Sequence, residues 1–90
     1  MASVVTYSDS VVASLCREVD GIRHRSSYLL NAIERCQNAC LTCRLHREFV
    51  QLQQRRLEVL NAARHWQQRS AAHSLGLAFL IELCGRPVSP

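Results

Sequence analysis

Lysine is absent from this sequence of 90 residues, and glycine, proline and aromatic residues are scarce. Arginine therefore supplies all 11 positive charges, against 7 acidic residues. The three glycines are isolated from one another, which excludes a glycine-rich loop that binds nucleotide phosphates. With only five aromatic residues, a hydrophobic core must be built mainly from Leu, Val, Ala and Cys. A lysine-free composition is typical of a GC-rich genome or of a small viral reading frame overlapping another gene.

Segments that would direct the chain to a membrane or to secretion are also missing. The N-terminal ten residues, MASVVTYSDS, lack the basic and apolar regions of a signal peptide. The most apolar run, residues 75–84, is too short to cross a bilayer and contains Glu82, so we expect no membrane span. Five cysteines without a signal peptide favour reduced thiols. We therefore expect a cytoplasmic protein, with the nucleus as the alternative.

The interior of the chain has neither glycine nor proline between residues 22 and 75 and few β-branched residues, which predicts helix throughout. The expected fold class is all-α, a two- or three-helix hairpin or bundle with a long central helical region. A chain this short hides only about 60% of its unfolded surface, so self-association into a homodimer or larger assembly is expected. We expect one helical domain over residues 8–85, with flexible ends at 1–7 and 86–90.

The ends of the helices follow from capping residues and apolar spacing. A first helix is predicted to begin at the Ser-Asp-Ser cluster of residues 8–10. A turn is predicted within residues 21–27, with Ser26 or Ser27 capping a second helical region. The last helix is expected from about residue 70 to 84, with a stop at Gly85.

The apolar face of the second helical region changes direction near residues 43–46. Two explanations remain open. The helix breaks there, with Thr42 as a cap, and the chain folds into a hairpin. Alternatively, one continuous rod buries two different sides against different partners.

Residues 36–46, CQNACLTCRLH, contain three cysteines and a histidine that suggest a metal site, a redox site or a packed helix face. On one straight helix Cys36 and His46 lie about 15 Å apart, too far to share a zinc ion, which needs ligands at about 2.0–2.3 Å. Free cysteines are among the most buried residue types. Packing is therefore the favoured interpretation, and we predict neither a bound metal nor a cofactor.

The sequence contains no pattern typical of an enzyme. Its serines, histidines and acidic residues are scattered and form no nucleophile motif. We therefore expect a protein without catalytic activity.

A polar stripe rich in Arg and Gln runs along the central region, opposite its Leu and Phe residues. Guanidinium groups donate to phosphates in a bidentate manner, and glutamine adds contacts that do not read sequence. A helix cannot enter the deep major groove of A-form RNA, so such a stripe suits shape-based binding of double-stranded RNA. An ordinary solvated helix face, an acidic protein partner and an anionic membrane surface are the alternatives. The candidate nucleic-acid-binding residues are Arg44, Arg47, Gln51, Arg55, His65 and Arg69.

Two residues of this region lie near or within the apolar side. Arg56 falls among the Leu and Phe residues, where we expect its side chain to reach solvent or to meet Glu48 or an acid of a partner. Trp66 is expected to be a packing anchor.

Apolar positions outside this stripe suggest where copies of the chain associate. The region after Tyr28 aligns several residues on one face, and the segment 75–84 is apolar nearly all round and must be covered. The candidate oligomer-interface residues are Leu29, Ile33, Cys36, Cys40, Leu75, Phe79 and Leu80.

Two resemblances bear on function. The small size, the helical content and the pattern FVQLQQRR at residues 49–56 resemble the RNA-silencing suppressors of nodaviruses. That resemblance implies a viral, dimeric helix-hairpin protein that binds double-stranded RNA. The segment RRLEVLNAARHW at residues 55–66 is similar to one helix of a spectrin-type repeat. It implies instead a helical-bundle or coiled-coil adaptor that binds another helical protein.

Overall fold

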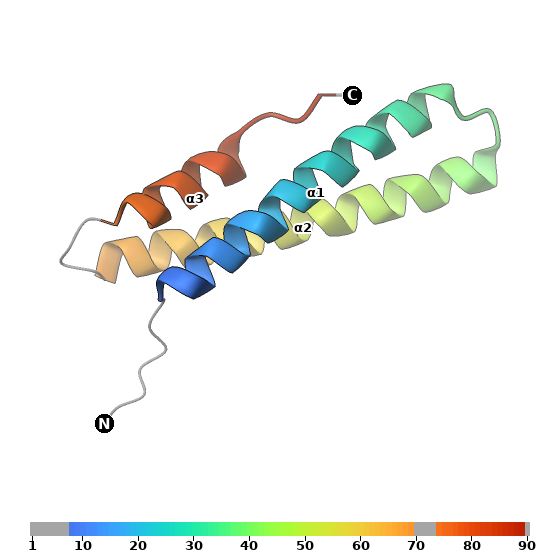
Figure 1. Ribbon diagram of the computed structural model, residues 1–90. Coiled ribbons are helices and arrows are strands. Elements are labelled where there is room, and N and C mark those ends of the chain that lie inside the picture. Colours follow the sequence, from blue (N-terminus) through green and yellow to red (C-terminus); the bar gives the residue numbers. More distant parts are fainter. Residues whose placement is uncertain (1–7, 70–73, 90) are drawn as a thin grey trace.

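The computed structural model describes residues 8–69 and 74–89, which form three α-helices and no strand (Figure 1). Helix α1 spans Asp9–Arg35, α2 spans Ala39–Arg69 and α3 spans Leu75–Gly85. Helices α1 and α2 form a long antiparallel hairpin, and α3 packs on its end opposite the connecting loop (Figure 1). The molecule measures 55 × 22 × 19 Å. The prediction of an all-α bundle is confirmed.

Helix α1 begins where the sequence predicts and then continues through the predicted turn. Ser8 caps it, accepting a hydrogen bond from the Val11 amide at 3.3 Å. The prediction of a turn within residues 21–27 is wrong, because tertiary contacts hold this stretch in the helix. Ser26, expected as a possible cap, is fully buried, and its hydroxyl accepts a hydrogen bond from Gln53 Nε2 at 2.8 Å.

The hairpin loop lies at residues 36–38, before the region where the apolar face changes direction. Asn38 starts α2, since its side-chain oxygen accepts from the Leu41 amide at 3.0 Å. Thr42, the cap expected if the helix were to break near residues 43–46, lies within α2 and donates to the Asn38 carbonyl oxygen at 2.9 Å. Helix α2 is therefore continuous through residues 43–46. The apolar face changes direction in this region because the chain reverses at residues 36–38, shortly before it.

Two ion pairs align α1 and α2 in a single register. Arg25 Nε donates to Glu48 Oε2 at 2.6 Å, and Arg55 Nε donates to Glu18 Oε2 at 2.6 Å. The two paired residues of α1, Glu18 and Arg25, are seven residues apart, and so are their partners on α2, Glu48 and Arg55. Equal spacing of seven residues in opposite chain directions is typical of an antiparallel coiled-coil pair. The buried residues of α1 follow the same spacing and are Val12, Val19, Ile22, Ser26 and Leu29.

The main hydrophobic core lies at the three-helix end of the molecule. Helix α3 is capped by Ser74, later than the predicted start near residue 70, and residues 70–73 lie outside the described part. A Cβ at Gly76 would lie 3.2 Å from Val12 Cγ1, so glycine lets α3 approach α1 closely. Trp66 packs against this core, as expected. The core cluster comprises Val12, Val19, Val59, Leu60, Ala63, Leu77, Leu80, Leu83 and Cys84.

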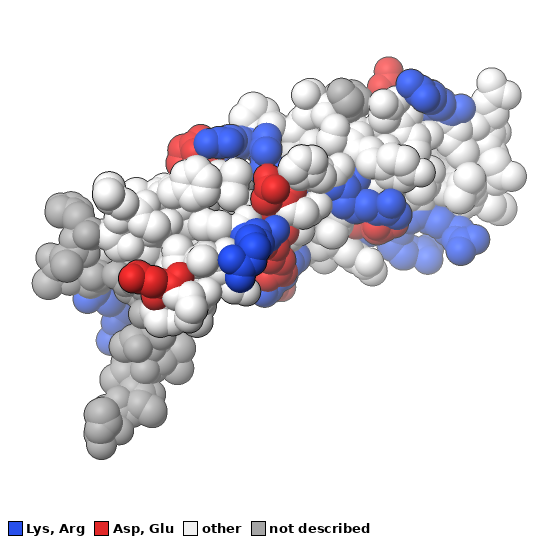
Figure 2. All heavy atoms as spheres, viewed as in Figure 1, with Lys and Arg blue, Asp and Glu red and all other residues white. Residues whose placement is uncertain are grey.

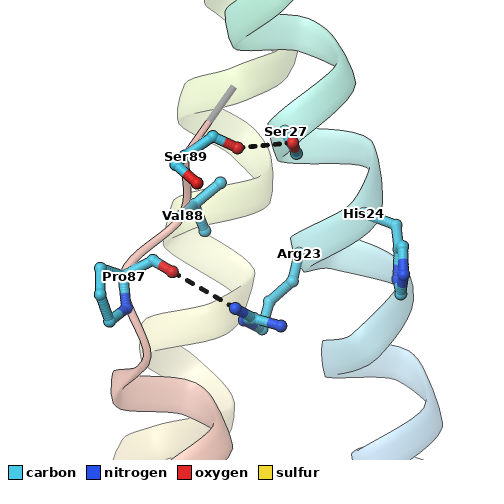
Figure 3. Close-up of a pocket in the computed structure, with 6 residues that line it drawn as sticks. All are labelled: Arg23, His24, Ser27, Pro87, Val88 and Ser89. Atoms are coloured by element: carbon cyan, nitrogen blue, oxygen red, sulfur yellow. Dashed lines mark hydrogen bonds between the residues drawn. The ribbon is translucent and has the colours of Figure 1, made fainter.

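After α3 ends at Gly85, as predicted, the chain continues along α1 toward the loop end (Figure 1). Arg23 Nη2 donates to the Pro87 carbonyl oxygen at 3.3 Å, and the Ser27 hydroxyl donates to the Ser89 carbonyl oxygen at 2.5 Å (Figure 3). The flexibility predicted for residues 86–90 stays a prediction. The flexible end predicted at 1–7 lies outside the described residues.

Candidate nucleic-acid interface

The outer face of α2 near the hairpin loop carries Arg44, Arg47 and Gln51, which we call the loop-end patch. All three are exposed, and the helix rises about 10 Å from residue 44 to residue 51. Neither arginine forms an ion pair within the described part of the chain. Figure 2 shows basic side chains gathered along the lower edge of this half of the molecule. The patch borders a shallow hollow lined by Cys43, His46, Arg47, Val50, Gln51 and Gln54.

Arg55, at the centre of the predicted binding face, is occupied by carboxylates. Its Nε and Nη2 donate to the two oxygens of Glu18 at 2.6 and 3.0 Å, and its Nη1 donates to Glu58 at 3.3 Å. These bonds raise the pKa of Arg55, and the hydrogen bond from Arg55 lowers the pKa of Glu18. Arg55 therefore holds α2 to α1 and is removed from the candidate phosphate contacts.

His65 and Arg69 form a second, separate patch at the other end of α2. Both are exposed, and Arg69 Nη1 lies 3.5 Å from His65 Nε2. His65 is 18 residues beyond Arg47, or about 27 Å along the helix. The predicted continuous ridge is therefore two basic patches separated by the ion-paired Arg55.

The acidic residue that lies next to the loop-end patch in the sequence is paired with an arginine of α1. Glu48, an acid next to the loop-end patch, is bound by Arg25 through two hydrogen bonds of 2.6 and 2.9 Å. The guanidinium of Arg25 also lies 5.0 Å from the centre of the Tyr28 ring. Because Arg25 neutralises the carboxylate of Glu48, this carboxylate does not offset the positive charge of Arg44 and Arg47.

Arg56 has a structural role that the sequence did not reveal. Its Nη1 donates to the Cys84 carbonyl oxygen at 2.6 Å, and its Nε donates to Gln53 Oε1 at 2.9 Å. The contact with Glu48, one of the alternatives expected for Arg56, does not form, since Glu48 pairs with Arg25. The position of Arg56 among apolar residues indicated from the sequence that this arginine has an unusual environment. Its acceptor could not be predicted, because it is a backbone carbonyl 28 residues away and a backbone carbonyl carries no sequence pattern.

The predicted oligomer-interface residues differ in how far they are buried within a single copy of the chain. Leu29 and Leu80 are fully buried within the monomer, so both are removed from the candidate interface. Ile33 and Cys36 are half-buried at the loop end of the hairpin. The exposed members are Cys40, Leu75 and Phe79, with Leu75 exposed to 89%.

The prediction that the cysteines are buried in a packed helix face holds for some of them and not for others. Cys84 is fully buried and Cys16 is half-buried, and burial raises the pKa of both thiols. Cys40 and Cys43, in contrast, are exposed on the first turns of α2, so their assignment to a packed face is wrong. Among residues 8–69 and 74–89, no group of three or more His, Cys, Asp or Glu side chains is placed to hold a metal ion.

The helices that the structure describes are all too short or too polar to cross a bilayer. No protein-family model, no curated protein and no solved structure matches this chain.

Proposed function

We propose that this chain is a non-enzymatic, self-associating helical protein that binds double-stranded RNA without sequence specificity through the outer face of α2. The observation that carries the proposal is the loop-end patch, where Arg44 and Arg47 are exposed, adjacent and without ion pairs in the described chain. Binding of double-stranded RNA is also what the resemblance to nodaviral silencing suppressors implies. A viral suppressor role in the cytoplasm belongs to the same proposal.

The chemistry of the loop-end patch suits a phosphate backbone. Each guanidinium offers a planar set of donors that matches phosphate oxygens, and Gln51 adds a neutral donor and acceptor on the same line. Contacts of this kind position a protein on a duplex without reading its bases. An exposed helix lying across the shallow minor groove would reach phosphates and 2′-hydroxyl groups.

A second copy of the chain would provide the extent that one patch lacks. Duplex-binding domains typically contact about 16 base pairs, whereas the loop-end patch rises only about 10 Å along α2. Two copies would present two such patches together with the His65 and Arg69 patches. Leu75 and Phe79 remain exposed for the contact between copies.

The experiment is a gel-shift titration of a duplex RNA at two salt concentrations. We expect Arg44→Gln with Arg47→Gln to weaken binding by at least about tenfold and to reduce the salt dependence by about two phosphate contacts per chain. The matched control is Arg17→Gln with Arg64→Gln, which removes the same charge from exposed positions off the patch. Equal losses in the two double variants, or no shift by the wild type in the micromolar range, would refute the proposal.

The apolar side chains on α2 favour a second candidate function, a helical adaptor that binds another protein. Leu41, Val50 and Leu57 are 46%, 49% and 47% exposed, although they lie on the same helix as the arginines. A protein partner would cover these side chains, whereas an RNA backbone would not. Val50→Ser with Leu57→Ser distinguishes the two functions, because duplex binding should be retained by this variant if the ligand is RNA.

A further inference from the structure

The exposed thiols of Cys40 and Cys43 are explained neither by packing nor by RNA binding. Both lie on the first turns of α2, directly after the hairpin loop. Cys36, in the loop, is half-buried and donates from its thiol to the Asn38 carbonyl oxygen at 3.4 Å. The sequence from residue 40 to 43 is therefore an accessible Cys-x-x-Cys pair at the start of a 31-residue helix.

We propose that Cys40 and Cys43 form a reversible disulfide within α2, which makes the loop end of the hairpin a thiol–disulfide switch. Residues three apart on a helix are neighbours, with Cβ atoms about 5–6 Å apart. A disulfide requires a Cβ separation of about 3.5–4.5 Å. The bond therefore needs a contraction of one helical turn and no rearrangement of the bundle.

The first turn of α2 is the part of the helix that can contract. Cys40 is the second residue of α2, where amide groups lack intrahelical acceptors. The turn is held by two exposed contacts of Asn38, from the Leu41 amide at 3.0 Å and from the Thr42 hydroxyl at 2.9 Å. Because a disulfide formed across a helical turn is strained, it is also readily reduced, which is the property of a switch rather than of a structural bridge.

The surroundings of the pair favour thiol exchange. Both thiols are exposed, so a dissolved disulfide can reach either sulfur. Exchange proceeds by attack of one sulfur on a disulfide and depends on this access. The core thiols differ, because Cys84 is fully buried and burial raises the pKa of both Cys84 and Cys16.

The oxidant is a small disulfide, for which oxidised glutathione is the probe. The thiolate of one cysteine attacks a glutathione sulfur, forms a mixed disulfide and releases one glutathione thiolate. The second cysteine thiolate then attacks the protein sulfur of this mixed disulfide, forms the Cys40–Cys43 bond and releases the second glutathione. The two protons of the protein thiols leave with the two reduced glutathione molecules, so the protein is oxidised by two electrons and glutathione disulfide is reduced by two.

The test treats the full chain with oxidised glutathione, labels free thiols with iodoacetamide after denaturation, and analyses tryptic peptides. Cleavage after Arg35 and Arg44 leaves all three loop-end thiols on the single peptide of residues 36–44. We expect this peptide to carry one label, on Cys36, and to lose two hydrogens, about 2 Da. Cys36→Ser should still form the bond, and Cys40→Ser or Cys43→Ser should abolish it.

Three results would overturn the proposal. They are a bond to Cys36, disulfide-linked dimers on a non-reducing gel, and three labels on the peptide under conditions that oxidise a small dithiol standard. Folding of each variant is checked by the resistance of Cys84 to labelling before denaturant is added, since this thiol is fully buried in the folded chain. Retention of RNA binding is measured separately, so failure of the switch and failure of the proposed function are distinguishable.

Discussion

Arg56 Nη1 donates a hydrogen bond of 2.6 Å to the carbonyl oxygen of Cys84, and this contact joins the middle of α2 to the last turn of α3. The final carbonyls of a helix lack intrahelical donors, and a cation near them is favourable. Through its Nε, Arg56 also donates to Gln53, which in turn donates to Ser26 on α1. One chain of polar contacts thus links all three helices.

Replacing Arg56 with methionine should destabilise the fold through the loss of this contact. A hydrogen bond from a charged donor contributes about 1.5–3 kcal/mol, and we expect the free energy of unfolding to fall by that amount. Urea denaturation followed by the fluorescence of Trp66, which packs against the core, measures it. The control is Arg64→Met, at an exposed position of the same helix. A loss for Arg56→Met no larger than for this control would contradict the structural role.

Ser26→Ala should lower stability although it is only a single-atom deletion. The Ser26 hydroxyl is fully buried and is an acceptor for Gln53, so its removal leaves a part-buried amide without that acceptor. We expect a loss of about 1–2 kcal/mol in the free energy of unfolding. Ser14→Ala makes the same substitution on the exposed side of α1 and should change stability by less than about 0.5 kcal/mol. Indistinguishable urea midpoints for the two variants would argue against a buried hydroxyl.

Two neighbouring residues of α3 should differ sharply in their sensitivity to truncation. Leu80 is fully buried, so Leu80→Ala should cost about 2–5 kcal/mol. Phe79 is 49% exposed, and Phe79→Ala should cost less than about 1 kcal/mol in dilute solution. If copies associate through Phe79, its effect should grow with protein concentration, which thermal unfolding over a hundredfold range of concentration detects. A larger loss for Phe79 than for Leu80 in dilute solution would mean that α3 is rotated relative to this structure.

The Glu18–Arg55 ion pair should give stability a dependence on pH in the acidic range. The pKa of Glu18 is lowered on folding by its hydrogen bond from Arg55. Its contribution is therefore complete above the unfolded value of about 4.5 and is lost as the pH falls through the folded value. Both side chains are about 40% exposed, so the contribution is below about 1 kcal/mol.

Urea titrations of wild type and Glu18→Gln at several pH values test this dependence. The two proteins should differ near neutral pH and converge in acid, where Glu18 is protonated. Glu34→Gln is the control, because Glu34 forms no ion pair in the described residues and should show no such convergence. A constant difference across the range would mean that the loss arises from packing rather than from charge.

The candidate site shows where inference from sequence reached its limit. The stripe of Arg and Gln on α2 was recognisable, because exposure on a helix follows from spacing along one element. The sequence did not indicate which arginines of the stripe form ion pairs with acidic residues. Glu18 lies 37 residues from Arg55, and only the hairpin brings the two side chains together. The exposure of Cys40 and Cys43 was missed for the same reason, since it depends on the chain reversal at residues 36–38.

The amino-acid sequence by itself determined the helical class, a helix start at the serine cluster of residues 8–10 and the end of the last helix at Gly85, because propensity and capping act within one or two turns. Only the tertiary structure decided that α1 runs unbroken through residues 21–27, that the loop lies at 36–38, and that Arg55 and Arg56 bind α1 and α3. The physical reason is that a buried hydroxyl, a carboxylate and a helix-terminal carbonyl acquire their partners from distant segments. The energies of those contacts outweigh the weaker local preferences for a turn or for a solvated side chain.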